Sequence, residues 1–372
     1  MLPSRSPLLR PLRALVALAA VVTVSLLAAC GAIGAPAGGA GVADPTVFHP
    51  GAPYTGKFAA GAVLQEGGTY YMVGTTVAHL NLPVMTSTDL QHWYARPAIP
   101  DYADFGGGPS YNEAMLTKPA WAWQVATRGT VPVMSQWAPS IAHIGEQYVV
   151  AFSAATADDT AGDRDSCIGL ATSVDPLGPY APQDAPLTCN PESRTGAIDP
   201  DFFTDPRTGQ QYLLWKDNGS RGSRPPYLMM RELDATGTAW APGSRPHPLI
   251  TQTLPWEDNL VENASMFYAR GRYVLLYSAG HYTTADYKIG YAVCTSPVGG
   301  CVKHRRPLLA TSGRIAGPGT PDAFRDTAGR IRMAYSAWTR GLVGAASGRH
   351  THIATLAIGR HGVVRLVDRG GA

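Results

Sequence analysis

Charged side chains are scarce in this sequence of 372 residues, where they make up 15% of the total instead of the usual quarter. The formal net charge of +3 comes from Arg5, Arg10 and Arg13 alone. The rest of the chain therefore balances 27 basic residues (30 − 3) against 27 acidic ones. No basic patch stands out from this balance, which argues against a nucleic-acid partner.

Helical periodicity is also missing, because beyond the first 29 residues no segment keeps apolar residues on one helical face. The chain contains 41 glycines and 31 prolines, so it is rich in turns. It is still 45% hydrophobic, which is enough to bury a large core. These features predict an all-β fold.

The chain has one long apolar run, residues 14–29, and this run is too short to span a membrane. It follows the three arginines, in the order typical of an export signal. It ends in Leu27-Ala28-Ala29-Cys30-Gly31, which resembles a bacterial lipobox. We predict a signal peptide over 1–29, lipidation of Cys30, a flexible tether over 30–42 and a protein held at the outer face of the cell membrane. The alternative is ordinary secretion with Cys30 incidental.

Cysteines are few: with Cys30 lipidated, four remain, Cys167, Cys189, Cys294 and Cys301. Export makes disulfides the default pairing for them. Of the three possible connectivities, the simplest joins 167 with 189 and 294 with 301. A zinc site is disfavoured, because no histidine at ligand spacing accompanies these cysteines.

An internal repeat organises the rest of the chain. Its unit is a glycine, one or two polar residues and then an aromatic and apolar strand, followed by a further strand. It recurs five times, at residues 68–73, 145–150, 209–214, 271–276 and 329–334. Repeats of this length, built from short strands and glycine turns, predict a five-bladed β-propeller of four-stranded antiparallel blades over 43–372. A β-sandwich is the alternative, and residues 94–135 read as an insertion between blades.

Each innermost strand of a propeller should directly precede the glycine turn of its repeat. In the third and fourth repeats these segments contain Asp199 and Glu262 at equivalent starts. Both carboxylates should therefore face one axial pocket. Apolar neighbours around Glu262 would raise the pKa of its carboxyl group, as a general acid requires. The alternative for Glu262 taken alone is an ordinary salt-bridged residue at the head of a strand.

The motifs at the blade starts resemble those of glycoside hydrolase family 43, which comprises arabinanases, arabinofuranosidases and xylosidases with five-bladed propellers. Each motif is short, but five occur in order at blade spacing. They are the segments 87–93, Trp137-Ala138-Pro139, Ile198-Asp199-Pro200, Val261-Glu262 and Gly317-Pro318-Gly319. The disulfide candidates and the segments 280–285 and 334–338 resemble the branch that processes arabinofuranose.

This resemblance implies an inverting acid/base mechanism on arabinan-type polysaccharide. Glu262 takes the place of the general acid, and Asp199 that of the carboxylate that raises the acid's pKa and orients it. Ala60 stands where the family has its general base. Asp44, in Asp44-Pro45, is a weak substitute for the base, and Glu113 is a weaker one.

The resemblance also names Trp137, His281 and Trp338 as residues that bind substrate. Thr320 and Ser336 replace histidines that are frequent in the family near a channel ion, so we predict no metal. We also predict no cofactor and a monomer. The loss of the base leaves a second hypothesis, a catalytically inactive glycan-binding lipoprotein with the same sugar pocket. A scaffold unrelated to sugar is disfavoured, because both carboxylates are present at their blade starts.

Overall fold

The predicted five-bladed β-propeller is confirmed. A computed structural model describes residues 58–76, 80–95, 113–128, 131–157, 165–190, 196–220, 224–345 and 348–369. Asp44, Cys30 and the predicted signal peptide and tether lie outside these residues. In the described part of the chain, no helix is both long enough and apolar enough to cross a membrane.

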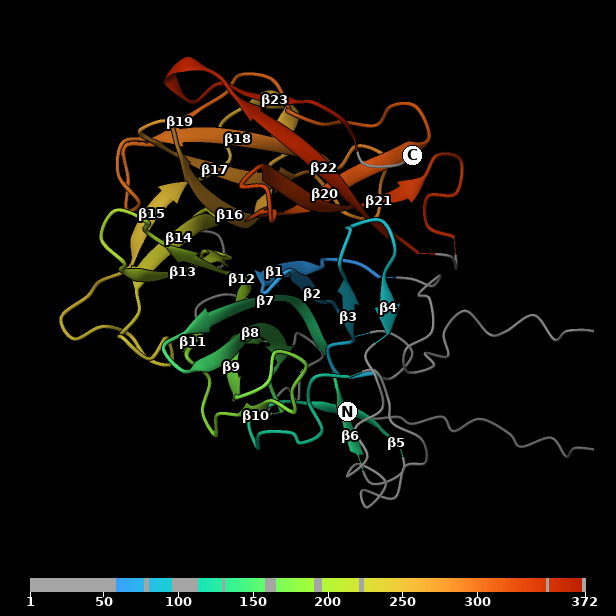
Figure 1. Cartoon of the computed structure of the whole chain (residues 1–372), viewed down its shortest axis with the longest axis vertical. Coiled ribbons are helices and arrows are strands. Elements are labelled where there is room, and N and C mark those ends of the chain that lie inside the picture. Colours follow the sequence, from blue (N-terminus) through green and yellow to red (C-terminus); the bar gives the residue numbers. More distant parts are fainter. Residues whose placement is uncertain are drawn as a thin grey trace, which may run out of the picture. The chain divides into compact units, whose positions relative to one another are not determined.

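Five antiparallel sheets follow one another along the chain and in space (Figure 1). Each sheet takes its strands in sequence order, so its first strand is also its innermost one. Blade 1 contains β1 (Ala62–Glu66), β2 (Thr69–Val73), β3 (Val84–Ser87) and β4 (Tyr94–Ala95). Blade 2 contains β7 (Gln136–Ile144), β8 (Gln147–Ala155), β9 (Ser166–Ser173) and β10 (Ala181–Pro182), with β11 (Thr188–Cys189) also paired to β9.

The remaining three blades are built in the same way. Blade 3 contains β12 (Ala197–Thr204), β13 (Gln211–Asp217), β14 (Tyr227–Glu232) and β15 (His247–Ile250). Blade 4 contains β16 (Val261–Ala269), β17 (Arg272–Ala279), β18 (Lys288–Cys294) and β19 (Val302–Lys303). Blade 5 contains β20 (Ile315–Arg325), β21 (Ile331–Thr339), β22 (His350–Ile358) and β23 (Val364–Leu366). Two 3-10 turns, η2 (Pro255–Glu257) and η3 (Arg360–Gly362), lie in connections.

The glycine of each repeat makes the turn between the first two strands of its blade. In blade 4 the turn residues Arg270 and Gly271 have φ of 50° and 77°, the left-handed values that a two-residue hairpin requires. Gly67 and Gly68 do the same in blade 1, with φ of 55° and 86°. The recurring glycine therefore fixes where each inner strand ends.

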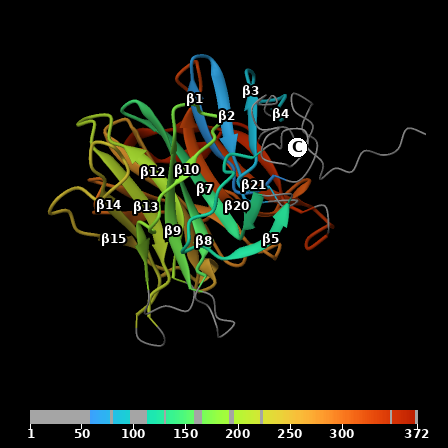
Figure 2. The ribbon, with the colours of Figure 1, turned by 90° about the horizontal axis from the view of Figure 1, so that it is seen from below.

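The hydrophobic core is divided into five parts, each lying between two neighbouring blades. The innermost strands β1, β7, β12, β16 and β20 contact one another in a closed ring, and Figure 2 shows the same blades from a perpendicular direction. Blades 5 and 1 share no sheet. The ring is closed instead by packing and by hydrogen bonds, among them the one from the Thr351 hydroxyl to the Phe58 carbonyl at 2.8 Å. Because the apolar packing lies between blades, the axis is left for polar groups.

The segment predicted as an insertion contains a separate two-stranded sheet, β5 (Gln124–Arg128) with β6 (Val131–Met134). Glu113 belongs to this segment. Its carboxylate is fully buried and accepts a hydrogen bond from the Asn81 amide at 2.9 Å, and its backbone bridges Pro83 beside blade 1. Glu113 therefore attaches the insertion to blade 1.

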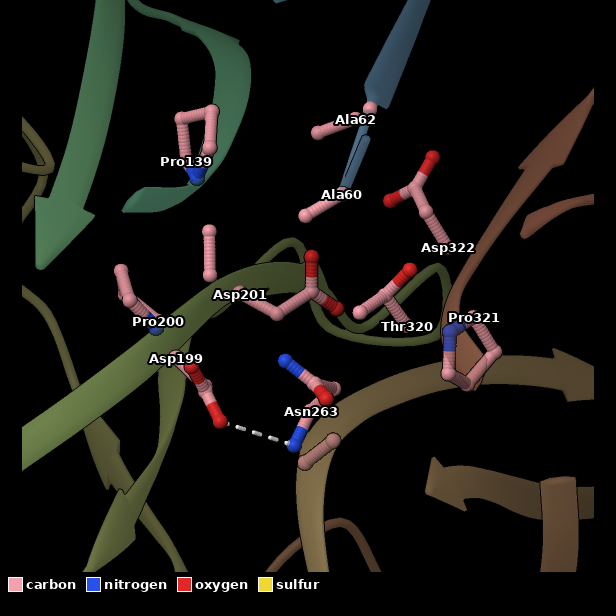
Figure 3. A pocket seen from close by; sticks show the side chains of 13 residues that line it. Ala60, Ala62, Pro139, Asp199, Pro200, Asp201, Asn263, Thr320, Pro321 and Asp322 are labelled. Atoms are coloured by element: carbon pink, nitrogen blue, oxygen red, sulfur yellow. Dashed lines mark hydrogen bonds between the residues drawn. The ribbon is translucent and has the colours of Figure 1, made fainter. Parts of the chain in front are cut away.

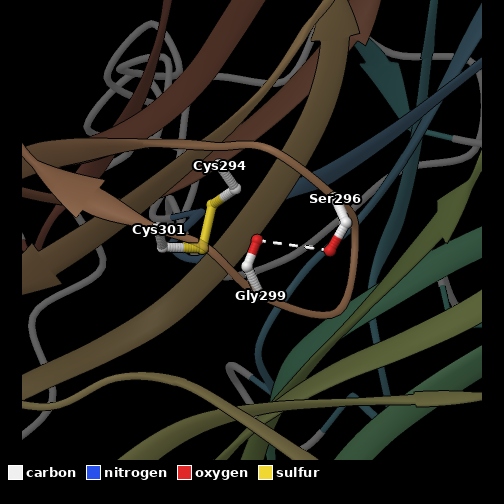
Figure 4. Close-up of a disulfide and its surroundings, with 4 residues drawn as sticks. All are labelled: Cys294, Ser296, Gly299 and Cys301. Atoms are coloured by element: carbon white, nitrogen blue, oxygen red, sulfur yellow. Dashed lines mark hydrogen bonds between the residues drawn. A yellow bond between two sulfur atoms is a disulfide. The ribbon is translucent and has the colours of Figure 1, made fainter.

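Two disulfides join Cys167 to Cys189 and Cys294 to Cys301, which is the simplest of the three connectivities. The second one closes a short turn in which the Ser296 hydroxyl donates to the Gly299 carbonyl at 3.3 Å (Figure 4). Both disulfides lie in the outer parts of their blades, on or beside the third strands. They stabilise the blades without contributing to the axis.

Candidate active site

A pocket of about 310 Å³ lies on the axis, and its walls come from the first-strand segments of all five blades (Figure 3). Each blade supplies one wall residue in the left-handed conformation. These residues are Ala60, Ala138, Asp199, Asn263 and Thr320, with φ of 51°, 44°, 56°, 49° and 53°. The register of the inner hairpin shifts at this point in blades 2 to 5, as it does at a β-bulge.

This repeated bulge makes the five positions equivalent. Asparagine and aspartate tolerate a left-handed backbone, whereas alanine and threonine adopt it only when the surrounding fold imposes it. Ala60 and Asp199 therefore hold the same position in two blades, one with a carboxylate and one with a methyl group. The sequence had set Asp199 and Glu262 at equivalent starts, but in the structure the counterpart of Asp199 in blade 4 is Asn263, and Glu262 lies one residue before it.

A first ring of hydrogen bonds links the bulges. In four blades, the bulge amide donates to a hydroxyl on or just beyond the second strand of the preceding blade. The pairs are Ala138 to Thr75 (3.1 Å), Asp199 to Ser153 (2.8 Å), Thr320 to Ser278 (2.7 Å) and Ala60 to Ser336 (2.8 Å). Blade 4 is the exception, because Lys216 occupies the hydroxyl's place in blade 3, opposite Ile198. The Asn263 amide donates instead to Asp199 Oδ2 at 3.3 Å.

Lys216 bonds to Glu262 instead. Its Nζ donates to Glu262 Oε2 at 3.0 Å, and the two side chains are 5% and 13% exposed. Glu262 borders the pocket, since the next two residues along β16 line it. The residue that interrupts the first ring, Lys216, therefore positions Glu262, the carboxylate predicted from the sequence to be the proton donor.

The Tyr287 hydroxyl binds the other oxygen of Glu262. It lies 2.7 Å from Glu262 Oε1 and 2.6 Å from Asn263 Oδ1. A phenol carries one proton, so it donates to one of these atoms at a time. If Glu262 is ionised, Tyr287 donates to it. If Glu262 is protonated, Glu262 donates to Tyr287 and Tyr287 donates to Asn263. The same atoms thus serve both forms of an acid.

Burial raises the pKa of Asp199 to about 7, and the negative charge of Glu262 adds to the rise. The positive charges of Lys216 and Arg349 and the Asn263 amide oppose it. The sequence had led us to expect this like-charge effect on Glu262. The structure shows the raised pKa on Asp199.

A second ring lies two residues further along the inner strands. Here the amide three residues beyond the bulge donates to a side chain of the preceding blade. The pairs are Phe202 to Ser140 (3.1 Å), Met266 to Asp201, Ala323 to Ser265 (3.0 Å) and Val63 to Asp322 Oδ2 (2.9 Å). A serine hydroxyl is sufficient for this bond in blades 2 and 4, and the two carboxylates therefore add acceptor capacity beyond what the fold requires.

Both of these carboxylates line the pocket, and in Figure 3 their oxygens point into the same space as the Ala60 methyl group. Burial raises the pKa of Asp322 to about 7. Burial and the charge of Asp322 raise the pKa of Asp201 well above its usual range. Two carboxyl groups so placed in a dry channel cannot both be ionised cheaply.

None of the three predicted substrate-binding residues lines the pocket. Trp137 is half-buried beside the bulge of blade 2, and His281 is exposed. Trp338 is buried, and its ring nitrogen donates to the Tyr282 carbonyl at 3.0 Å. Their role in substrate binding therefore stays a prediction.

Five polar residues of the site were not predicted from the sequence: Lys216, Tyr287, Asp201, Asp322 and Arg349. An alignment of the second strands of the repeat would have marked Lys216, because the other blades have a serine or threonine at the matching position. An alignment two residues past each bulge would have marked both aspartates. Arg349 has no such signal, because it precedes a third strand. Its guanidinium lies 5.2 Å from the Tyr282 ring centre, and its Nη1 is buried without a hydrogen-bond partner.

Within the described ranges, no group of three or more His, Cys, Asp or Glu side chains could hold a metal ion. What the site does offer is several carboxylates around one axial pocket, one of which, Glu262, is bonded by a lysine and a tyrosine. This arrangement suits proton transfer to and from a bound molecule.

Residues 55–364 match the family described as glycosyl hydrolases family 43, which is more than half of the chain. The chain belongs to this family. A comparison with curated proteins gives no significant match.

Solved structures of family 43 enzymes share this fold. A thermostable family-43 glycoside hydrolase aligns with a TM-score of 0.67 at 22% identity, over 85% of this chain and 94% of that one. An endo-1,4-β-xylanase from Bacteroides thetaiotaomicron gives 0.63 at 22% identity, over 86% and 97%. An exo-1,5-α-L-arabinanase from a bovine ruminal metagenomic library gives 0.61 at 19% identity, over 87% and 99%. At these identities the likeness shows the fold alone, and the relatives differ in their sugar.

Proposed function

We propose that this family 43 protein hydrolyses arabinofuranosyl linkages of plant polysaccharide with inversion of configuration. Glu262 protonates the leaving oxygen, and Asp199 orients the acid and tunes its proton affinity. The observation that supports this proposal most strongly is the joint site of the two carboxylates. They come from neighbouring blades, the amide of Asn263, next to Glu262 in the chain, donates to Asp199, and the charge of Glu262 raises the pKa of Asp199.

The surroundings of Glu262 suit a group that gives up and regains a proton. Lys216 stabilises the anion left after the proton is given up, and Tyr287 can bond to either form. Asp199, with its pKa of about 7, holds the second proton of the pair near neutral pH. A general acid needs to be available in its protonated form at the working pH.

Arabinofuranose is the sugar favoured by the segments 280–285 and 334–338, which resemble the arabinofuranose branch of the family. The structural relatives include both a xylanase and an arabinanase. The sugar is therefore tested by comparison. Purified protein is assayed with 4-nitrophenyl α-L-arabinofuranoside, 4-nitrophenyl β-D-xyloside and linear arabinan, and we expect the highest kcat/KM on the arabinofuranoside.

Glu262→Gln is the variant that tests the site. It keeps the shape and one hydrogen-bond acceptor of the side chain but cannot donate a carboxylic proton. We expect kcat to fall by about 10²–10⁴-fold, the usual contribution of a general acid, with sugar affinity retained. Unchanged turnover in this variant would show that the proton comes from elsewhere and would refute the assignment.

The second candidate is a glycan-binding protein without turnover. It is favoured by one observation, the methyl group of Ala60 at the blade 1 position that matches Asp199 in blade 3. In this case arabino-oligosaccharides bind, as measured by calorimetry, while neither glycoside is cleaved. Ala60→Asp would then introduce turnover on a near-zero background.

We also propose that the protein is exported and anchored through a lipid on Cys30, with arabinan-type chains as its partner outside the cell. The lipobox-like sequence before Cys30 supports this proposal. Cell fractionation is the test: the natural protein should sediment with membranes and Cys30→Ser should appear in the medium. Equal release of both would contradict the anchor.

A further inference from the structure

The inner hairpin of blade 1 lacks a carboxylate of its own at the mouth of the pocket. Ala60 cannot accept a proton. Asp44, the first substitute that the sequence suggests, lies outside the described residues. Glu113, the second, is fully buried in its contact with Asn81 and is not part of the pocket wall. Among the described residues of the wall, a base for the attacking water has to be a carboxylate from another blade.

Asp322 reaches blade 1 from blade 5. Its Oδ2 accepts the Val63 amide at 2.9 Å, and Val63 lies three residues beyond Ala60 on the same segment. Within the described structure this is the one hydrogen bond that its carboxylate accepts, and it leaves Oδ1 available. The side chain is partly exposed and lines the pocket, and Figure 3 shows its carboxylate directed toward Ala60 and Ala62.

Asp201 is the other carboxylate at this depth, and it is less suited to the role. It is 8% exposed and accepts from the Ser140 and Ser265 hydroxyls and the Met266 amide. Its carboxylate also bonds to blade 4, the blade of the proton donor, whereas the carboxylate of Asp322 bonds to blade 1. An inverting base has to act from the opposite face of the sugar, and blade 1 is not a neighbour of blade 4 in the ring of inner strands.

The charge of the pair supports this division. Burial and the charge of Asp322 favour a proton on Asp201, whose pKa lies well above its usual range. Burial brings the pKa of Asp322 to about 7, which suits a group that takes up a proton near neutral pH. With Asp201 neutral, Asp322 can be the ionised member of the pair.

We propose that Asp322 is the general base of this enzyme, acting from blade 5 on a water held in the space beside Ala60. The water oxygen bonds to the anomeric carbon while the glycosidic C–O bond breaks, and its electron pair goes to the leaving oxygen. Glu262 gives that oxygen a proton, and Asp322 takes one proton from the attacking water. Each turnover consumes one water, and solvent returns both carboxyl groups to their starting states. This inference rests on the proposed function.

Asp322→Ser is the deciding variant. Serine supplies the hydroxyl that Ser140 and Ser265 supply to the same ring, so the bond to Val63 can be kept while the base is lost. We expect kcat on the aryl arabinofuranoside to fall by about 10²–10⁴-fold, with the melting temperature and the affinity for arabino-oligosaccharides close to those of the natural protein. Azide, which attacks without a base, should restore turnover and give a glycosyl azide of inverted configuration.

Two further variants separate a lost base from a damaged fold. In the double variant Ala60→Asp/Asp322→Ser, a carboxylate returns from blade 1 and should restore activity, which repair of packing alone would not do. Asp205→Asn is the matched control, because Asp205 is a buried carboxylate of blade 3 bonded to the Tyr273 hydroxyl away from the pocket. It should lower stability and leave kcat unchanged. If Asp322→Ser does not fold, Asp322→Asn, whose amide oxygen can accept from Val63, replaces it in every assay.

The outcomes distinguish the two proposals. If Asp322→Ser retains natural turnover while Glu262→Gln is inactive, the base assignment is wrong and the hydrolase stands. If the natural protein binds sugar, cleaves neither aryl glycoside and gains activity from Ala60→Asp alone, Asp322 is no base and the protein is a glycan-binding module. A loss in Asp322→Ser that azide does not restore also overturns the inference.

Discussion

The two sides of the axial pocket differ in how their carboxylates are held. On the side of blades 3 and 4, Glu262 is bonded by Lys216 and Tyr287, and Asp199 by the Asn263 amide. We call this the supported side. On the side of blades 5 and 1, Asp322 is the one carboxylate among the described residues of the wall, and the other residues there are Ala60, Gly61, Ala62, Thr320 and Pro321. We call this the open side.

The difference fits the two halves of an inverting hydrolysis. A proton donor acts on one atom of the leaving group, so hydrogen-bond partners must hold its side chain in one orientation. The group that activates water needs space for that water instead, which small residues leave free. The supported side is therefore arranged for donating a proton and the open side for admitting a nucleophile.

Removing the lysine of the supported side should have the largest effect. Lys216→Met leaves Glu262 without its cation, and we expect kcat to fall by about 10²-fold, the lower range for loss of acid catalysis. Lys216 also lowers the pKa of Asp199, so the pH–rate profile should shift to higher pH. Steady-state kinetics from pH 4 to 9 measures both effects.

The matched control is a second buried Lys–Glu pair in blade 4. Lys303 lies 2.7 Å from both oxygens of Glu257, which is fully buried and also bonded by the Tyr277 hydroxyl. This pair lies away from the pocket. Lys303→Met should cost about 3–5 kcal/mol of unfolding free energy while the folded fraction keeps its kcat. If both variants lowered kcat equally, Lys216 would have no catalytic role beyond the stabilising role of Lys303.

The carboxyl pair that faces both sides makes stability depend on pH. Because the folded protein raises the pKa of Asp322 from 3.8 to about 7 and raises that of Asp201 well above its usual range, it binds these protons more tightly than the unfolded chain does. The free energy of unfolding should therefore fall as pH rises from about 4 to 7, by up to about 1.4 kcal/mol per pH unit for each group.

Asp201→Asn removes one of the two charges and keeps the shape of the side chain. We expect it to raise the free energy of unfolding by about 1–3 kcal/mol at pH 8 and to change it little at pH 4, where the natural carboxyl is neutral. Urea unfolding at the two pH values measures this. A variant less stable than the natural protein at pH 8 would show that the bonds from Ser140 and Ser265 outweigh the repulsion by Asp322.

Tyr287→Phe tests the finer organisation of the supported side. The variant removes the hydroxyl that bonds Glu262 and Asn263 and leaves the ring in place. One hydrogen bond of this kind is worth about 1 kcal/mol, so kcat should fall about fivefold. A loss in KM with kcat unchanged would instead show that Tyr287 contacts the sugar.

The sequence was sufficient to predict the propeller, because glycine turns and strand spacing repeat along the chain. It also predicted that Asp199 and Glu262 would face one pocket, although it set them at equivalent positions, which the structure gives to Asp199 and Asn263. It could not predict the bond from Lys216 to Glu262, which joins second and first strands of different blades. Asp322 was missed for a similar reason. The search for a base assumed a carboxylate on blade 1, whereas the structure brings one to blade 1 from its neighbour.

The smallest effect concerns the backbone of the open side. Ala60 is held at a φ of 51°, a conformation that costs an alanine about 1–2 kcal/mol and a glycine almost nothing. Ala60→Gly should therefore raise the free energy of unfolding by about 0.5–1 kcal/mol, after the entropy that glycine adds to the unfolded chain. The control is Ala62→Gly, two residues further along the same segment and outside the set of positive φ values. It should lower stability by about 0.5–1 kcal/mol. Thermal unfolding distinguishes the opposite signs, and equal signs would show that the bulge of blade 1 is not under the strain that its φ indicates.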